Sequence, residues 1–113
     1  MLHKDIRIEF DCGHYEAVGF LGHDEPSVDG KTMMERTSGG NSVGIGNKDY
    51  RFLREHRKEF PTRLRPYCLV TNRRIPGHSR SFSCFVWDGS EWCESTGFFD
   101  DDWGESVLVL CRV

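Results

Sequence analysis

Hydrophobic and polar residues alternate in several short runs of this chain, which is the pattern of strands with one buried face. Residues 5–10 alternate isoleucine and phenylalanine with charged residues, and this run predicts a first strand. Residues 81–95 contain two aromatic-rich runs that meet at Asp88-Gly89, a dipeptide typical of β-hairpin turns. In the first of these runs Phe82 falls on one face and Phe85 on the other. We therefore expect this hairpin at the centre of the sheet.

Two registers of this hairpin fit the sequence equally well. A two-residue turn at Asp88-Gly89 would place Cys84 opposite Cys93, which would allow a cross-strand disulfide. A three-residue loop would instead place Val86 opposite Trp92. The five cysteines of the chain form no CxxC pair and mostly lie in apolar runs, so we expect them to be buried, reduced thiols.

Helical spacing of apolar residues occurs in two segments. Residues 31–38 predict a short helix that begins near Asp29 or Ser27 and turns its two methionines toward the sheet. Residues 47–60 predict a longer amphipathic helix with a basic outer face, which ends before a proline and is followed by one further turn. Between these helices, residues 38–47 are rich in glycine and predict a connecting loop.

The remaining runs complete the predicted fold. Residues 67–71 and 107–113 read as strands, residues 72–80 as a polar loop, and residues 14–22 as either a short strand or irregular chain. Strands that follow helices and are joined by hairpins are typical of an antiparallel α+β fold. We therefore predict a single α+β domain, residues 1–113, with an antiparallel sheet of about four to six strands and two helices packed on one face.

Composition agrees with this prediction. The chain has 113 residues, and its eight Phe, three Trp and three Tyr can fill one hydrophobic core. No apolar run approaches the length of a membrane span, and the first residues lack the apolar segment of a signal peptide. We therefore expect a cytoplasmic protein.

Charge is unevenly distributed, although the formal net charge is only −3. Residues 48–80 hold ten Lys or Arg and three Asp or Glu, whereas residues 81–113 hold one and seven. These segments could neutralise each other, or the basic one could bind single-stranded nucleic acid, because arginines beside aromatic rings suit phosphate contact and base stacking. The acidic net charge weighs against a dedicated nucleic-acid binder. The arginines of this alternative are Arg63, Arg65, Arg73, Arg74 and Arg80.

An acidic, aromatic segment at residues 98–103 is a candidate partner-binding surface. Aromatic anchors inside a ring of carboxylates are typical of interface hot spots. If the rings are exposed, the segment favours a protein partner; if they are buried, they belong to the core at the edge of the sheet. The residues are Phe98, Phe99, Asp100, Asp101, Asp102 and Trp103.

Catalytic and metal-binding patterns are weak in this sequence. A cysteine nucleophile needs a neighbouring histidine, and Cys12 with His14 is the one local pair of this kind. Nothing in the sequence identifies a third residue to orient the histidine, so an enzyme is the less favoured alternative. The spacing of cysteines and histidines is not that of a zinc site, and we predict no metal and no cofactor.

The second half of the chain carries a pattern resemblance. It joins FLREHRKEFPTRLRPYCLVTN, a W-D-G-S-E-W hairpin, the run DDDW and a final apolar strand. In this respect it is similar to small bacterial proteins of unassigned function, some of which are carried on mobile gene cassettes. The resemblance implies an accessory protein and brings no catalytic residues with it.

These features together favour a small binding or accessory protein over an enzyme. The preferred ligand class is a protein partner or a small molecule, bound either at residues 98–103 or at the glycine-rich loop. Single-stranded nucleic acid is the first alternative. A homodimer would also cover any sheet face that the helices leave open.

Overall fold

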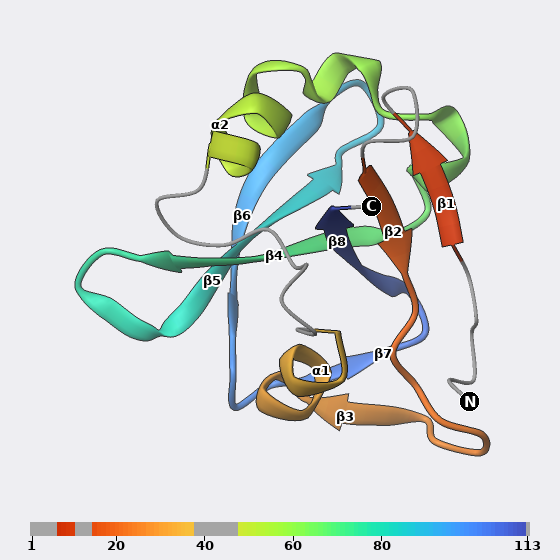
Figure 1. Ribbon diagram of the computed structural model, residues 1–113, viewed down its shortest axis with the longest axis vertical. Coiled ribbons are helices and arrows are strands. Elements are labelled where there is room, and N and C mark those ends of the chain that lie inside the picture. The colour runs from red at the N-terminus through yellow and green to blue at the C-terminus, as the bar shows by residue number, and fades with distance from the viewer. Residues whose placement is uncertain (1–6, 11–14, 38–47, 113) are drawn as a thin grey trace.

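The computed structural model describes residues 7–10, 15–37 and 48–112, which have an α+β fold (Figure 1). Neither helix within these ranges is long and apolar enough to cross a lipid bilayer. In chain order the elements are β1 (Arg7–Phe10), β2 (Tyr15–Val18), β3 (Ser27–Asp29), α1 (Gly30–Thr37), α2 (Lys48–Glu55), two 3₁₀ turns (Arg57–Glu59 and Thr62–Leu64), β4 (Cys68–Ile75), β5 (His78–Trp87), β6 (Trp92–Phe98), β7 (Asp102–Gly104) and β8 (Val107–Arg112).

Six of the described strands form one sheet in the order β1-β2-β8-β4-β5-β6, and β3 pairs with β7 separately. Neighbouring strands of the large sheet are antiparallel except β4 and β8, which are parallel. The strand number agrees with the prediction, but the purely antiparallel sheet that was predicted is wrong. The chain leaves the edge strand β6, passes through β7 and returns as β8 between β2 and β4. Because this crossing ends inside the sheet, β8 acquires one parallel neighbour.

The sheet has a hydrophobic core on each face. On β8, Leu108 belongs to the core that contains Leu53 of α2, whereas Val109 belongs to the core that contains Met33 of α1. Figure 1 shows the two helices on opposite sides of the sheet, so the predicted packing of both on one face is wrong. The consecutive apolar residues of β8 require cover on both faces, because strand side chains alternate between them. Residues 107–111 of β8 are accordingly all buried.

The predicted helices are both present, but the second is shorter than expected. Asp29 caps α1, because its Oδ1 accepts a hydrogen bond from the backbone N of Thr32 at 2.7 Å. Both methionines of α1 are buried against the sheet, as predicted. The second helix, α2, ends at Glu55 and gives way to a 3₁₀ turn, after which the ring of Phe60 packs edge-on against Phe85. The further turn predicted after the proline is the 3₁₀ turn Thr62–Leu64.

The β5–β6 hairpin has neither of the two registers that the sequence suggested. Trp87 lies opposite Trp92, and Cys84 lies opposite Ser95. Cys93 is therefore displaced from Cys84 along the strand, and the cross-strand disulfide has no geometric basis. No disulfide joins the described cysteines.

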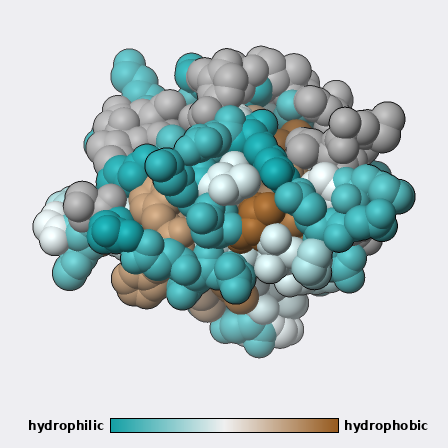
Figure 2. All heavy atoms as spheres, turned by 90° about the horizontal axis from the view of Figure 1, so that it is seen from below, coloured by the Kyte–Doolittle hydropathy of each residue, from teal (hydrophilic) through white to brown (hydrophobic). Residues whose placement is uncertain are grey.

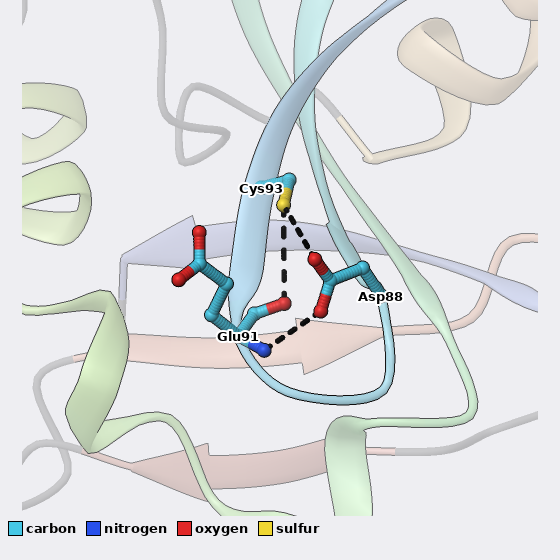
Figure 3. A group of neighbouring side chains, drawn as sticks. All are labelled: Asp88, Glu91 and Cys93. Atoms are coloured by element: carbon cyan, nitrogen blue, oxygen red, sulfur yellow. Dashed lines mark hydrogen bonds between the residues drawn. The ribbon is translucent and has the colours of Figure 1, made fainter.

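The hairpin turn explains this register. Its tip is Gly89-Ser90, where Gly89 has a φ of +104°, a conformation that favours glycine. Asp88 is still paired, since its backbone N donates to the carbonyl of Glu91 at 3.0 Å. Its carboxylate accepts a hydrogen bond from the backbone N of Ser90 at 2.8 Å. It accepts another from the backbone N of Glu91, also at 2.8 Å (Figure 3). Asp88 thus caps the turn with its side chain, and residues 88–91 separate the paired Trp87 and Trp92, one residue more than in the longer of the two expected loops.

The predicted polar loop at residues 72–80 is wrong, because the β4–β5 hairpin runs through most of it. β4 continues to Ile75 and β5 begins at His78, so only Pro76-Gly77 separates them. Gly77 has a φ of +81° and allows the tight turn. Figure 1 shows this hairpin projecting from the sheet as an arm. Residues expected in a loop are therefore held on strands, and their side chains point to defined faces.

Candidate functional site

A cavity of about 530 Å³ opens beside α1, where the β4–β5 hairpin and the turn after β6 approach the helix. Its volume lies within the range of small-molecule sites, roughly 300–1,000 Å³. We call this cavity the α1 pocket. It is lined by Asp29, Lys31, Met34, Glu35, Asn72, Arg74, Arg80, Phe99 and Asp100.

Phe99 forms the apolar part of the α1 pocket together with Met34. The Phe99 ring packs edge-on against Phe82 with 5.2 Å between centroids. Its carbonyl accepts a hydrogen bond from the backbone N of Gly30 at 2.9 Å, which joins the turn to the first residue of α1. A Cβ atom on Gly30 would lie 2.7 Å from Phe99 Cα, so this close approach requires glycine. The fold thus fixes Phe99 relative to α1.

The guanidinium group of Arg74 lies over the Phe99 ring. Its guanidinium carbon lies 4.2 Å from the centroid of Phe99, a cation–π contact. Its Nε atom donates to Asn72 Oδ1 at 3.2 Å. Because both contacts hold one guanidinium, Arg74 is oriented before any ligand arrives.

The walls of the α1 pocket carry charges of both signs. The cations are Lys31, Arg74 and Arg80, and the carboxylates are Asp29, Glu35 and Asp100. Arg80 and Asp100 form an exposed ion pair with each other. Hydrogen bonds from the side chain and backbone of Thr32 lower the pKa of Asp29, which keeps its carboxylate ionised. The pocket therefore has no strong net charge but can contact groups of either sign.

The candidate partner-binding segment does not form one exposed aromatic surface. Phe98 is 49% exposed, whereas Phe99 and Trp103 are only partly exposed and pack against the core of the α1 face. The Trp103 indole N donates to the carbonyl of Phe98 at 3.1 Å. The three carboxylates between them, Asp100, Asp101 and Asp102, are exposed. Two of the three rings thus fit the alternative in which they belong to the core at the edge of the sheet.

Viewed from the end that carries α1, β3 and β7, the surface is mainly hydrophilic (Figure 2). Apolar atoms appear there as separate patches between polar side chains. The described apolar side chains on this face therefore form separate patches rather than the broad apolar area that a stable protein interface usually buries.

The five candidate nucleic-acid arginines do not share a face. Arg73 and Arg74 are neighbours on β4 and point to opposite sides: Arg73 lies 4.8 Å from the ring centroid of Tyr50 on the α2 side, and Arg74 contacts Phe99 on the α1 side. Arg65 follows the second 3₁₀ turn and lies over the Trp87 ring at 3.9 Å. Arg63 is exposed on the same turn, and Arg80 pairs with Asp100. Four of the five already contact an aromatic ring or a carboxylate of this chain.

A smaller cavity of about 190 Å³, the α2 pocket, lies on the opposite face of the sheet; Tyr50, Arg73, Ser83 and Glu94 are among its lining residues. The Tyr50 hydroxyl donates to Glu94 Oε1 at 2.5 Å, and Arg73 Nη1 donates to Ser83 Oγ at 3.0 Å. Burial, reinforced by the Glu94 hydrogen bond, raises the pKa of Tyr50 to about 12. These polar groups form hydrogen bonds with one another, so the α2 pocket is lined by a polar network within the chain.

The weaker candidates add no site. Cys12 and His14, and the glycine-rich loop 38–47, lie outside the described residues. At the hairpin tip, Asp88, Glu91 and Cys93 come close together, but the Asp88 carboxylate is directed at the Glu91 backbone N and the Cys93 thiol (Figure 3). The backbone N–H groups of Glu91 and Ser90 lower the pKa of Asp88 to about 2. This cluster is explained by the turn that it caps.

Sequence reasoning identified part of the α1 pocket and missed the rest. Arg74, Arg80, Phe99 and Asp100 were candidates, but for two different functions. The site candidates did not include the other five lining residues: Asp29, Lys31, Met34, Glu35 and Asn72. A longer β4 would have placed Asn72 and Arg74 on one face by alternation, but the expected loop at 72–80 hid this signal.

Comparisons with known proteins give no match: no family model, curated protein or solved structure matches this chain.

Proposed function

We propose that the protein binds a small molecule in the α1 pocket. The observation that carries this proposal is the convergence of four separate segments on one open cavity of about 530 Å³. Asp29 comes from the end of β3, Met34 from α1, Arg74 from β4 and Phe99 from the turn after β6. A concave site with an apolar part and a few oriented polar groups is the usual form of a small-ligand site.

Two other candidate functions have less support. A protein partner at residues 98–103 would rely on Phe98 as its single well-exposed ring. Nucleic-acid binding would need the arginines to act together, although they lie on different faces and contact groups within this chain. For small-molecule binding, by contrast, four of the candidate residues already line one pocket: Arg74, Arg80, Phe99 and Asp100.

The test is a ligand titration followed by heteronuclear NMR of the isotope-labelled protein. The probes are acetate, phosphate, ethylammonium and glycine at millimolar concentration. We expect at least one probe to shift the backbone resonances of residues that line the α1 pocket, in a saturable manner. Arg74→Ala should abolish these shifts, because it removes the oriented guanidinium.

Arg63→Ala is the matched control, since it makes the same change of charge and size at an exposed position away from the α1 pocket. It should leave the titration unchanged. The proposal fails if no probe shifts resonances of the α1 pocket, or if Arg63→Ala and Arg74→Ala have equal effects.

A further inference from the structure

Arg74 has donors that its contacts within the chain do not use. Among the described residues, Asn72 accepts from Nε, and neither terminal nitrogen of Arg74 has a hydrogen-bond acceptor. Arginine presents its donors in a planar fork that matches the two oxygens of a carboxylate. Because Phe99 and Asn72 already orient the group, little conformational entropy is lost when an anion binds. This end of the α1 pocket is suited to a carboxylate.

The remaining charges of the α1 pocket disfavour an ion of one sign alone. A multiply charged anion such as phosphate would approach Asp29, Glu35 and Asp100, and like charges repel at short range. A lone cation would meet Lys31, Arg74 and Arg80. A ligand that carries one positive and one negative group can pair with both the carboxylates and the cations that line the pocket. Phe99 and Met34 also line the pocket, and their apolar side chains can contact a short carbon skeleton that joins the two charged groups of the ligand.

We propose that the ligand of the α1 pocket is a zwitterion of the amino-acid type, with its carboxylate on Arg74 and its ammonium group facing Asp29. The chemistry is a carboxylate and an ammonium separated by a short chain, which is found in free amino acids and in short peptides. This inference rests on the proposed small-molecule function and specifies the class of ligand. Asp29 is the acceptor named for the ammonium because Asp100 already pairs with Arg80 and Glu35 also has a partner.

The experiment compares dissociation constants of the full chain for acetate, ethylammonium, phosphate, glycine, γ-aminobutyrate and triglycine, measured by the same NMR titration. At least one of the three zwitterions should bind about tenfold more tightly than acetate or ethylammonium, because each charge-assisted hydrogen bond adds roughly a factor of ten. Tight binding of glycine or γ-aminobutyrate assigns a free amino acid, and tight binding of triglycine alone assigns a peptide.

Three variants test where the carboxylate and the ammonium group of the ligand bind. Arg74→Lys keeps the charge but loses the fork, and we expect about tenfold weaker binding of the zwitterion. Asp29→Asn keeps a residue that caps helices well, so α1 should stay folded while the zwitterion's affinity falls to that of acetate. Arg63→Ala should change nothing.

Two results separate the ligand class from the proposed function. If acetate or phosphate binds the α1 pocket as tightly as every zwitterion, the zwitterion is wrong and small-molecule binding stands. If none of the probes shifts resonances of this pocket, both fail. Equal affinity of wild type and Asp29→Asn for the zwitterion would also overturn the inference, because the ammonium would then have no partner at Asp29.

Discussion

The two faces of the sheet are built from the same strands but are packed differently. On the α2 face, aromatic rings stack on one another: Tyr50 on Phe85, and Phe60 edge-on against both Phe85 and Trp92. On the α1 face the core consists mainly of valine, methionine and cysteine, with Phe20 and Phe82 as its fully buried rings. The cavity on the α2 face is about 190 Å³, whereas the α1 pocket is about 530 Å³.

This difference suggests a division between stability and binding. Large rings fill the α2 face, so that face contributes much of the apolar area buried on folding. The α1 face is covered by a helix of eight residues and by the small β3–β7 sheet, and charged side chains line the space that they leave. A fold can tolerate a hollow on one face when the opposite face is well packed.

The largest effect should come from removing a ring on the α2 face. Phe85 and Phe82 are both fully buried on β5 and point to opposite faces. Phe85→Ala should lower the free energy of unfolding by about 3–5 kcal/mol, and Phe82→Ala by about 1 kcal/mol less, because the Phe99 ring that packs on Phe82 borders the α1 pocket and has room to relax. Urea unfolding measures both. Val86→Ala, at a 38% exposed position, is the control and should cost less than about 1 kcal/mol.

Equal losses for the two phenylalanine variants would contradict the proposed difference in packing. A larger loss for Phe82→Ala would reverse it.

A smaller effect is expected from adding one methyl group on the α1 face. A Cβ atom on Gly97 would lie 2.5 Å from Trp103 Cη2 and 2.6 Å from Phe82 Cε1. Gly97→Ala should therefore displace Trp103 and cost about 1–3 kcal/mol, with a shift in tryptophan fluorescence. Ser95→Ala, two residues earlier on the same strand and exposed, should leave both readouts unchanged. Wild-type stability and fluorescence in Gly97→Ala would show that this face is less tightly packed around Trp103 than described.

The polar network of the α2 face should appear as a dependence on alkaline pH. The folded state raises the pKa of Tyr50 to about 12 by burial and by its hydrogen bond to Glu94. A raised pKa stabilises the folded protein below the ordinary tyrosine value of about 10, and this contribution is lost as pH rises through 12. A titration at 295 nm should therefore contain one tyrosine that ionises near pH 12, and Tyr50→Phe should remove it. A wild-type titration in which every tyrosine ionises near pH 10 would contradict this network.

The smallest effect on stability is expected from Glu25, a partly exposed carboxylate at the edge of the α1 face. Hydrogen bonds from Arg36 and from the backbone N of Gly22 lower the pKa of Glu25 to about 2. A lowered pKa stabilises the folded protein above the ordinary value of about 4.3, and this contribution is lost as pH falls toward 2. The urea midpoint of the wild type should therefore fall more steeply over this range than that of Glu25→Gln. The pKa of Asp88 is also lowered to about 2, and that of Asp29 is lowered as well, so these two carboxylates keep part of the acid sensitivity in the variant.

Local patterns in the sequence were sufficient to predict most of the elements. Alternation and β-propensity placed strands at residues 5–10, 67–71, 81–87 and 107–113, and Asp29 was one of two residues expected near the start of α1. These signals are local because periodicity and capping involve residues only a few positions apart. The same reasoning failed at residues 72–80, where a proline and a glycine suggested a long loop but form only a two-residue turn.

The candidate site could be predicted only in part. Arg74 and Phe99 were both identified, but their contact joins β4 to the turn after β6, and nothing in the spacing of these residues indicates that they meet. The apolar run of β8 did carry a usable signal, since five consecutive buried residues imply an interior strand covered on both faces.

By itself the sequence determined both helices, most of the strands, which side chains share a face of the predicted strands, and that the chain has an α+β fold. The tertiary structure alone decided that β8 enters the sheet beside β4, that α1 and α2 lie on opposite faces, and that Arg74, Phe99 and Asp29 surround one pocket. The physical reason is range: hydrogen bonds within a turn or helix act between neighbours in the chain, whereas sheet order and pocket walls depend on packing between residues that are distant in sequence.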